Sequence, residues 1–402
     1  MNTEPGREFS RITGRPKICI VTPQYPPKDW GGLARTVENI ALLAAHIGLD
    51  VHIAHIYTEN TSYVLLDENR TTEIIHTITV HRIKAGKQSI PEKGRKLGDC
   101  SHTLTLQMMY HSLEQLYLDE KFSLFHSFFL FPCVYITGLL AKRYHVPLIA
   151  TLVGNDINKY MFSPEKVAAC RSGLENADRV VALSQDLLDK AHSLSPVKHK
   201  GDVIYNSVSI PDQIWTDPPA KPFCVGFAGI FKYAKGLPYL FKAVAEIAQK
   251  QDIILELPGR VRKEEMDIFH QAVDRTGIKP FLRLLPPISR DRINDWLMTL
   301  HLFVLPSLTE GCPNMLMEAM ALGLPCIATQ TGANSVLMDP MVSGMIVPWG
   351  NSKELEIAIL NMMKDREAAR SMGRKAREKM MLFSGEREKN AWEKIYKTFM
   401  EF

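Results

Sequence analysis

Several features that would identify a class of protein at once are missing from this sequence. It has no Cys-x-x-Cys pair and no histidine cluster at zinc-ligand spacing, so the seven scattered cysteines predict no zinc site. Their odd number and wide spacing favour a reducing compartment over a disulfide framework. No Gly-x-Gly-x-x-Gly follows the strand expected over 17–22 or the one expected over 223–227, which argues against a nicotinamide-dependent oxidoreductase.

The sequence also has little excess of charge of either sign. Its 48 Lys and Arg residues are nearly balanced by 44 Asp and Glu residues, which gives a formal net charge of +4. A balance this near neutrality does not make nucleic acid the default partner, and we expect none. Anionic small molecules and lipid head groups stay open as ligands. The 46% hydrophobic and 23% charged residues are ordinary for globular proteins, and 402 residues predict two to three domains, or two large ones.

The sequence predicts neither a signal peptide nor a membrane span. Residues 1–21 carry acidic and polar residues where an apolar secretory core would lie, so we expect a disordered leader before the first strand. The longest apolar stretch, residues 124–141, approaches the length of a membrane helix. His126 and the mid-run Pro132 favour a strand, a loop and a new helix instead. We therefore expect a cytoplasmic protein.

Short β-branched runs alternate with helical periods through the first half of the chain, a pattern typical of a parallel sheet covered by helices. Residues 17–22 and 51–56 predict strands, and apolar residues recur at three- and four-residue steps between Val37 and Ile47. Gly48 is the expected C-terminal cap of that helix. The other elements expected here are extra strands within 63–84, a helix over 104–118, strands over 147–152, 180–183 and 202–205, and an N-cap at Ser184.

A break with four prolines and no periodicity spans residues 206–222 and is the expected linker. Beyond it, strands are expected over 223–227, 253–257, 281–285, 302–305 and 325–328, and helices over 237–250, 263–276, 291–299 and 314–321. The predicted fold class is α/β, with two Rossmann-like domains, 1–210 and 223–384, whose parallel sheets face an interdomain cleft. Ligands of such sheets bind at the carboxyl ends of the strands.

The most informative segment is residues 302–328, LFVLPSLTEGCPNMLMEAMALGLPCIA. A strand ends before a loop that carries Glu310, and a helix begins near Asn314, whose free N–H groups and dipole suit a phosphate. Glu310 and Glu318 lie on this loop and helix, and carboxylates accept hydrogen bonds from sugar hydroxyls. The combination predicts a site for a nucleotide sugar. For a pair of glutamates alone, a solvated helix face is the alternative.

These residues resemble the E-x7-E donor-site signature of retaining GT-B glycosyltransferases, in the large "glycosyl transferases group 1" family that includes many lipopolysaccharide, capsule and phosphatidylinositol mannosyltransferases. The resemblance extends along nearly the whole chain. VTPQYPPKDWGGLARTVENIALLAAHIGLDVHIAH resembles the family's opening strand, Gly-Gly loop and first helix, and VGFAGIFKYAKGLPYLFKA its entry to the second domain. LENADRVVALSQDLLDKA and VIYNSVSI resemble two family segments between them.

The resemblance implies a role for each matching residue. Glu310 would bind the donor hexose, Glu318 the ribose hydroxyls, and Lys235 the diphosphate as it leaves; an ordinary helix-start turn is the alternative for Lys235. Gly31 and Gly32 would let the first-domain backbone approach the donor phosphate or the acceptor, and a plain tight turn is compatible with that. The distal phosphate would lie against the backbone of Gly311, Cys312, Pro313, Asn314, Met315 and Leu316.

Three positions depart from the family pattern. Val153 stands where many relatives have histidine or arginine, and Ser335 stands where glutamate is common. Ile230 occupies the position where relatives often place a phosphate-binding arginine, and a nearby cation would have to replace it. The expected donor site therefore also includes Gly229, Lys232 and Arg260.

The acceptor side is expected in the first domain, around Asn155, Asp156 and His126. Asp156 either caps the following turn or places and polarises the acceptor. His126 follows an expected strand, where it either faces the cleft or packs under a loop. The basic segment 82–96 and the aromatic run 128–131 are candidates for peripheral contact with a lipid-linked acceptor at the inner face of the cytoplasmic membrane; for the basic segment, a solvated loop is the alternative.

The resemblance thus implies a retaining hexosyltransferase that uses a nucleoside diphosphate sugar and an acceptor hydroxyl, in the synthesis of cell-surface glycans or glycolipids. Glu310, Asp156 and Lys235 are the expected catalytic residues. No metal or other cofactor is expected, since no Asp-x-Asp pair occurs and Lys235 with helix dipoles replaces a divalent cation. Residues 385–402 would return to the first domain as a helix. The alternatives are a non-catalytic GT-B subunit that binds nucleotide sugar and partners an active transferase, and an epimerase of the same fold.

Overall fold

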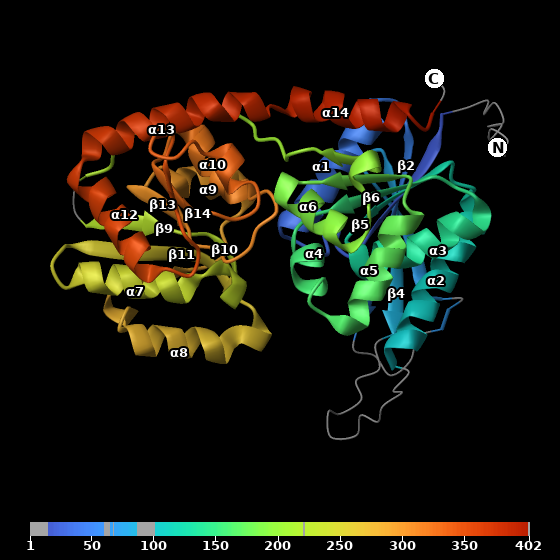
Figure 1. The fold of residues 1–402 in the computed structure, drawn as a ribbon, viewed down its shortest axis with the longest axis horizontal. Helices are drawn as coiled ribbons and strands as arrows, with labels where there is room; N and C mark the ends of the chain where they lie inside the picture. The colour runs from blue at the N-terminus through green and yellow to red at the C-terminus, as the bar shows by residue number, and fades with distance from the viewer. Residues whose placement is uncertain (1–14, 60–64, 67, 87–100, 220–221, 401–402) are drawn as a thin grey trace.

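The computed structural model describes residues 15–400 except 60–64, 67, 87–100 and 220–221, and the side chains at 59, 101, 102 and 155 are also outside the description. Two α/β domains stand side by side, each with a sheet between helices, as the sequence predicts (Figure 1). The expected leader and most of the basic segment 82–96 lie outside the described residues.

The described residues of the first domain form an eight-stranded sheet in the order β3-β4-β2-β1-β5-β6-β7-β8. Neighbouring strands are parallel except for β3, which runs antiparallel to β4. β5 and β6 are buried along their whole length, including the polar residues His126, Ser127 and Thr151 within them. The strands are β1 (Lys17–Thr22), β2 (Asp50–Glu59), β3 (Arg70–Ile75), β4 (Ile78–Gly86), β5 (Leu124–Phe128), β6 (Leu148–Leu152), β7 (Arg179–Ala182) and β8 (Gly201–Val203).

Helices cover both faces of this sheet (Figure 1). Ser184 caps its helix as predicted, because its Oγ accepts a hydrogen bond from the N–H of Leu187 at 3.3 Å. Gly48 follows the first helix with a φ of +98°, a conformation that suits glycine at a helix end. The helices are α1 (Gly32–His46), α2 (Ser101–Glu120), α3 (Tyr135–Tyr144), α4 (Asn155–Tyr160), α5 (Pro164–Asn176) and α6 (Gln185–Leu194).

The long apolar stretch 124–141 forms β5, a π-helical turn (Leu130–Val134) and then α3, so the prediction of strand, loop and helix is confirmed. Within the part of the chain that the structure describes, no helix is long and apolar enough to cross a membrane. Phe128 and Leu130 are fully buried, and Phe129 and Phe131 are half-buried. The aromatic run 128–131 therefore packs into the domain and does not form the exposed surface that membrane contact requires.

Arg82, the first residue of the basic segment, is also buried, with 7% of its surface exposed. Its guanidinium donates to the carbonyl oxygens of Tyr25 and Pro26 and pairs with Glu73. It therefore fastens the loop after β1 to β4 and is not part of a solvated basic patch.

The described residues of the second domain form a parallel sheet in the order β10-β11-β9-β13-β14-β15, with β12 also pairing with β11. Its strands are β9 (Phe223–Gly226), β10 (Gly229–Phe231), β11 (Ile253–Val261), β12 (Leu282–Leu285), β13 (Leu302–Leu305), β14 (Cys326–Thr329) and β15 (Met345–Val347). Its helices are α7 (Leu237–Ala248), α8 (Met266–Thr276), α9 (Ile293–Leu297), α10 (Asn314–Leu322), α11 (Asn334–Leu337), α12 (Ser352–Lys364) and α13 (Arg366–Met380).

Two segments connect the domains. α14 (Gly385–Lys397) follows α13 and crosses back to the first domain (Figure 1), where Trp392 and Tyr396 are fully buried. The described part of 206–222 contains no helix or strand, yet it is fastened to the second domain. Trp215 Nε1 donates to the carbonyl oxygen of Leu300 at 2.8 Å, and Asp217 pairs with Arg370 at 3.0 Å.

Candidate active site in the interdomain cleft

Loops from both domains meet where the carboxyl ends of the two sheets face each other. Val153 and Gly154 follow β6 in the first domain, and Glu310 and Gly311 lie in the loop after β13 in the second. The two backbones touch, since a Cβ added to Gly311 would lie 2.4 Å from the carbonyl oxygen of Val153. A side chain at this position would force the loops apart, so their contact depends on glycine.

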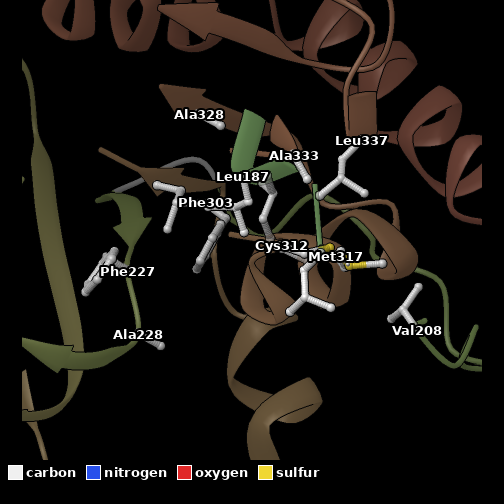
Figure 2. Close-up of a cluster of buried hydrophobic side chains, with 14 of the residues drawn as sticks. Leu187, Val208, Phe227, Ala228, Phe303, Cys312, Met317, Ala328, Ala333 and Leu337 are labelled. Carbon is white, nitrogen blue, oxygen red and sulfur yellow. Dashed lines mark hydrogen bonds between the residues drawn. The ribbon is translucent and has the colours of Figure 1, made fainter. Parts of the chain in front are cut away.

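Apolar packing continues beneath these loops. Leu187 of α6 lies among second-domain side chains such as Phe303 and Ala333 (Figure 2), and all three belong to one buried cluster. The sulfur atoms of Cys312 and Met317 are 3.7 Å apart in the same cluster. A shared core therefore fixes the loops of the two domains relative to each other.

Glu310 is a nearly buried carboxylate in the cleft, with a side chain only 8% exposed. Lys235 Nζ lies 2.6 Å from its Oε1, and the Ser307 hydroxyl donates to the same oxygen at 2.6 Å. Both of these partners contact Oε1, and no described residue forms a hydrogen bond with Oε2, which is therefore available to accept one from a ligand hydroxyl.

Lys235 is positioned by a short turn at the start of α7. Gly236 has a φ of +70°, and a Cβ there would lie 1.9 Å from the carbonyl oxygen of Pro306, so the turn packs against the end of β13 only with glycine. The N–H of Leu308 donates to the carbonyl oxygen of Ala234 at 2.9 Å. The loops that carry Lys235 and Glu310 are thus fastened to each other, and the ion pair is preorganised.

Positive charge gathers beside this ion pair. Burial lowers the pKa of Lys232, and the neighbouring cations Arg262 and Lys235 lower it further, while Glu265 raises it. Arg260 is exposed on the adjacent strand β11. A half-buried lysine whose neighbours are mostly cations gains favourable interactions when an anion binds.

Three of the glycines expected in the donor site border open space. A Cβ added to Gly31, Gly32 or Gly229 would have no heavy atom within 4 Å. Gly31 and Gly229 have φ values of +148° and +139°, which side chains rarely adopt. At these positions no side chain covers the backbone, so a ligand can approach it closely.

Glu318, on α10, is paired across the cleft. Its carboxylate contacts the guanidinium of Arg35 on α1, and the two side chains are 10% and 24% exposed. Nε of Arg35 is buried without a hydrogen-bond partner among the described residues. The residue expected to bind ribose is therefore also an interdomain contact, and Arg35 keeps an unused donor beside it.

Two asparagines add further bonds between the domains. Asn206 Nδ2 donates to the carbonyl oxygen of Cys312 at 3.0 Å and to Oδ1 of Asn314 at 2.9 Å. Asn158 Nδ2 donates to the carbonyl oxygen of Glu310 at 3.2 Å, and Lys190 Nζ holds Asn158 Oδ1 at 2.6 Å. The loop of Glu310 and the start of α10 are thus tied to the first domain.

Asp156 is fully buried and does not face the cleft as an acceptor contact would. Its carboxylate accepts hydrogen bonds from the backbone N–H groups of Leu130, Val153 and Gly154. Burial raises its pKa, although these backbone bonds oppose the rise. These three donors precede Asp156, so the carboxylate shapes the loop that touches Gly311, a role beyond capping the turn that follows.

His126 is fully buried as well, so in this structure it cannot contact an acceptor. Its Nδ1 lies 2.8 Å from the hydroxyl of Tyr396 on α14, and its Nε2 lies 2.7 Å from Oγ1 of Thr151. Burial lowers the pKa of its ring to about 3. The side chain of Asn155 lies outside the described residues.

A cavity of about 600 Å³ is bordered by the Glu310 loop, by α6 and by the loops after β14 and β15. Asp186 and Lys190 line its first-domain wall, and Ser335 and Trp349 line its second-domain wall. The volume is within the range of small-ligand sites. Ser335, one of the departures from the family pattern, therefore borders space that a longer side chain could fill.

Sequence reasoning missed Arg35, Asn158, Asn206 and Ser307. Arg35 follows the Gly-Gly loop at the start of a helix, and Asn206 lies in VIYNSVSI, so both were within segments already recognised. Their partners lie in the other domain, however, and no local pattern indicates which residue faces which across a cleft.

Two family models match the chain. The model described as Glycosyltransferase Family 4 covers residues 30–210, and the model described as Glycosyl transferases group 1 covers residues 222–365. Together they account for both domains.

Individual proteins are similar over nearly the whole chain. A D-inositol 3-phosphate glycosyltransferase from Kribbella flavida is 23% identical over 407 residues, covering 93% of this chain and 92% of the relative. Sucrose-phosphate synthase from Thermosynechococcus elongatus superposes with a TM-score of 0.76 at 19% identity, over 96% of this chain and 99% of that one. HepE from Anabaena in complex with UDP-glucose gives a TM-score of 0.74 at 17% identity, over 95% and 99%. These superpositions show a shared fold.

Proposed function

Because the chain belongs to the glycosyl transferases group 1 family, we propose that it transfers a hexose from a nucleoside diphosphate sugar to an acceptor hydroxyl with retention of configuration. Glycosyltransferase activity follows from the family. The donor class, the retaining course and the residue roles are the proposal.

The observation that carries the proposal is the arrangement around Glu310. Its Oε2 is available to a sugar hydroxyl, while Lys235 and the half-buried Lys232 offer positive charge next to it. A nucleoside diphosphate sugar presents both complementary groups, hydroxyls at one end and a diphosphate beside them. The complex of HepE with UDP-glucose supports a donor of this class on the same fold.

In the proposed reaction the acceptor hydroxyl attacks the anomeric carbon on the face from which the diphosphate departs. The new carbon–oxygen bond forms as the bond to the diphosphate breaks, and the outgoing phosphate oxygen takes the proton of the acceptor. No protein nucleophile is required, and burial raises the pKa of the nearby Cys312 thiol to about 12, which keeps it protonated.

Lys235 neutralises the charge that develops on the leaving diphosphate, because a cation already fixed in place needs no reorganisation during the reaction. Lys232 adds positive charge at the same end of the cleft. These two side chains take the electrostatic role that a divalent cation has in other transferases, so we propose a reaction without metal.

Glu318 binds the ribose hydroxyls, and Arg35 shares that carboxylate from the first domain. The acceptor, a glycan or lipid-linked glycan of the cell surface, enters between the domains beside Gly31. Trp30, next to it, is 68% exposed and offers a flat apolar surface for a sugar ring. Asp156 acts as a positioning residue, because it holds the backbone of Val153 and Gly154.

A thermal-shift panel of nucleoside diphosphates and their sugar conjugates tests the donor site. Binding to the folded state stabilises it by about 2.7 kcal/mol when the ligand concentration is about 100-fold above Kd. We expect one nucleoside diphosphate to raise the unfolding midpoint, and one of its sugar conjugates to raise it further. No shift with any member of the panel would contradict the proposal.

The departures at Val153, Ile230 and Ser335 favour a second candidate, a non-catalytic GT-B subunit that binds nucleotide sugar and partners an active transferase. Release of nucleoside diphosphate from the bound donor, with water or added glycans as acceptors, separates the two. Turnover that disappears in Glu310→Gln supports the enzyme. Tight binding without turnover supports the subunit.

A further inference from the structure

Two histidines and a glutamate come together on the first sheet, away from the cleft. His52 lies near the start of β2 and His81 near the start of the neighbouring strand β4, and they are 6% and 3% exposed. Their rings are nearly parallel, at 16°, with Nδ1 of His52 2.9 Å from Nε2 of His81. Glu120, the last residue of α2, brings its carboxylate close enough that the three ligand atoms lie within 4.8 Å of one another.

We propose that His52, His81 and Glu120 form a binding site for a divalent transition-metal ion of the zinc type, which clips β2, β4 and α2 together. Two imidazoles and one carboxylate are an established zinc ligand set, with a fourth position left for water. The Glu120 side chain is 28% exposed, which gives the ion and that water a path from solvent. The site lies at the amino ends of the strands, so its effect is on stability and not on transfer.

The outer nitrogens of the two rings already have partners. Asp50 Oδ1 lies 3.7 Å from Nε2 of His52, and Thr72 Oγ1 lies 3.0 Å from Nδ1 of His81. Since a carboxylate only accepts, Asp50 favours the proton of a neutral His52 on Nε2, and Nδ1 then turns a lone pair towards His81. Such outer partners orient histidines for metal binding.

The pair then has two states, which differ in whether Nε2 or Nδ1 of His81 carries the proton. With the proton on Nε2, it bridges the two rings, and this is the metal-free form. With the proton on Nδ1, His81 donates to Thr72, and two lone pairs face each other at 2.9 Å, an arrangement that a bound cation stabilises. Exchange of one proton between the nitrogens of His81 therefore prepares the site.

The surrounding charges permit a cation. Metal ions bind the neutral form of imidazole. Asp50 and Glu120 supply negative charge, whereas Lys17 and Arg70 oppose it. Lys17 Nζ occupies Oε2 of Glu120 at 2.8 Å, which leaves Oε1 as the ligand oxygen.

For the two rings the required adjustment is small, while the Glu120 carboxylate, which lies within 4.8 Å of the ring nitrogens, also has to move towards the ion. Two nitrogens bound to one tetrahedral zinc ion at about 2.0–2.1 Å lie about 3.3 Å apart, so the rings need to separate by about 0.4 Å. Mg²⁺ and Ca²⁺ prefer sets of oxygen ligands, and we expect the site to reject them.

Calorimetric titration of the chelator-treated full chain with ZnCl2 tests the proposal. We expect one equivalent to bind and to raise the unfolding midpoint, and MgCl2 to do neither. His81→Gln and Glu120→Gln should each weaken zinc binding by more than the roughly 10- to 100-fold that changes around a ligand cause. His46→Gln, at an exposed position on α1, is the matched control and should bind as the wild type does.

X-ray absorption spectroscopy of the zinc-loaded wild-type chain identifies the ligands without relying on a variant that folds. A shell with two imidazoles and oxygen is expected. The proposal is overturned by the absence of stoichiometric binding, by a shell with fewer than two imidazoles, or by unchanged affinity in both folded variants.

Discussion

Glu310 is where the proposed chemistry can be tested with the smallest change. Glu310→Gln keeps the size of the side chain and can still accept the hydrogen bonds of Lys235 and Ser307. We expect donor turnover to fall by at least about 100-fold, as when one transition-state contact is removed. Nucleoside diphosphate affinity, measured by calorimetry, should stay nearly unchanged. Equal losses in turnover and affinity would show that Glu310 does not read the sugar.

Lys235→Ala separates phosphate binding from sugar binding. Nucleoside diphosphate affinity should weaken by roughly 1.5–3 kcal/mol, the value of a hydrogen bond to a charged group. Lys242→Ala, at an exposed position on α7, the helix that follows Lys235, is the matched control. Unchanged affinity in isothermal titration of Lys235→Ala would remove this lysine from the phosphate site.

Some site residues could be predicted from the sequence because their positions are local. Glu310, Glu318 and Lys235 lie in short motifs next to strand ends, and the structure brings all three to the cleft, while their roles stay predictions. His126 was predicted to follow its strand, but it is the third residue of β5, and its partner Tyr396 lies 270 residues away. The position of a residue along a strand indicates how far it lies from the end of the sheet. It does not indicate which distant element packs against its side chain.

The loop after β13 is the element on which the two domains meet. In Gly311→Ala the added methyl group meets the carbonyl oxygen of Val153, a backbone atom that cannot rotate away. We expect a destabilisation of about 1–3 kcal/mol, as for other overpacked contacts, and a weaker donor affinity. Chemical denaturation and calorimetry measure the two effects.

Gly385→Ala, at the start of α14, is the control for Gly311→Ala. The nearest atom to its added Cβ is 3.9 Å away, which is ordinary contact. Equal stability of the two variants would mean that the loops do not need their close approach.

Most strands could be predicted from the sequence to within one or two residues, because strands buried on both faces read as continuous apolar runs. β2 and β11 extend three and four residues beyond their predicted ends, and α12 and α13 were not predicted. β10 and β15 were missed, since each is three residues long and too short for a period. The histidine pair could not be predicted from the sequence, because His52 and His81 are 29 residues apart and come into contact only when β2 and β4 pair.

At the scale of the whole molecule, the pair of Arg35 and Glu318 holds the domains together across the cleft. Arg35→Met should leave the mostly buried Glu318 without its partner, at a cost of about 1–3 kcal/mol. We expect a larger radius of gyration in X-ray scattering and a lower unfolding midpoint. The double variant Arg35→Met with Glu318→Gln should recover part of the midpoint, and an unchanged radius of gyration in Arg35→Met would contradict this role.

Buried histidines make the whole chain sensitive to acid. Burial lowers the pKa of His55 and His81 to about 4 and that of His126 to about 3, whereas an unfolded histidine titrates near 6.5. Below about pH 6.5 the unfolded state therefore binds more protons, and stability falls by up to about 1.4 kcal/mol per pH unit for each histidine. The buried Asp156 and Glu388, whose pKa burial raises, act in the opposite sense.

Urea denaturation at pH 7.5, 6.5 and 5.5 with a chelator present checks this prediction. The unfolding midpoint should be highest at pH 7.5 and fall towards pH 5.5, and His126→Gln should show a shallower fall. A midpoint that does not change over this range would contradict the assignment.

α14 has a consequence for the order of events during synthesis. Trp392 and Tyr396 complete the core around Ile18, although the ribosome makes them after the entire second domain. At about 5–20 residues per second, residues 210–396 take roughly 10–40 s to add, and the surface that α14 later covers stays bare throughout. The first domain is therefore translated first but completed last, and for that interval it offers an apolar surface to chaperones on the nascent chain.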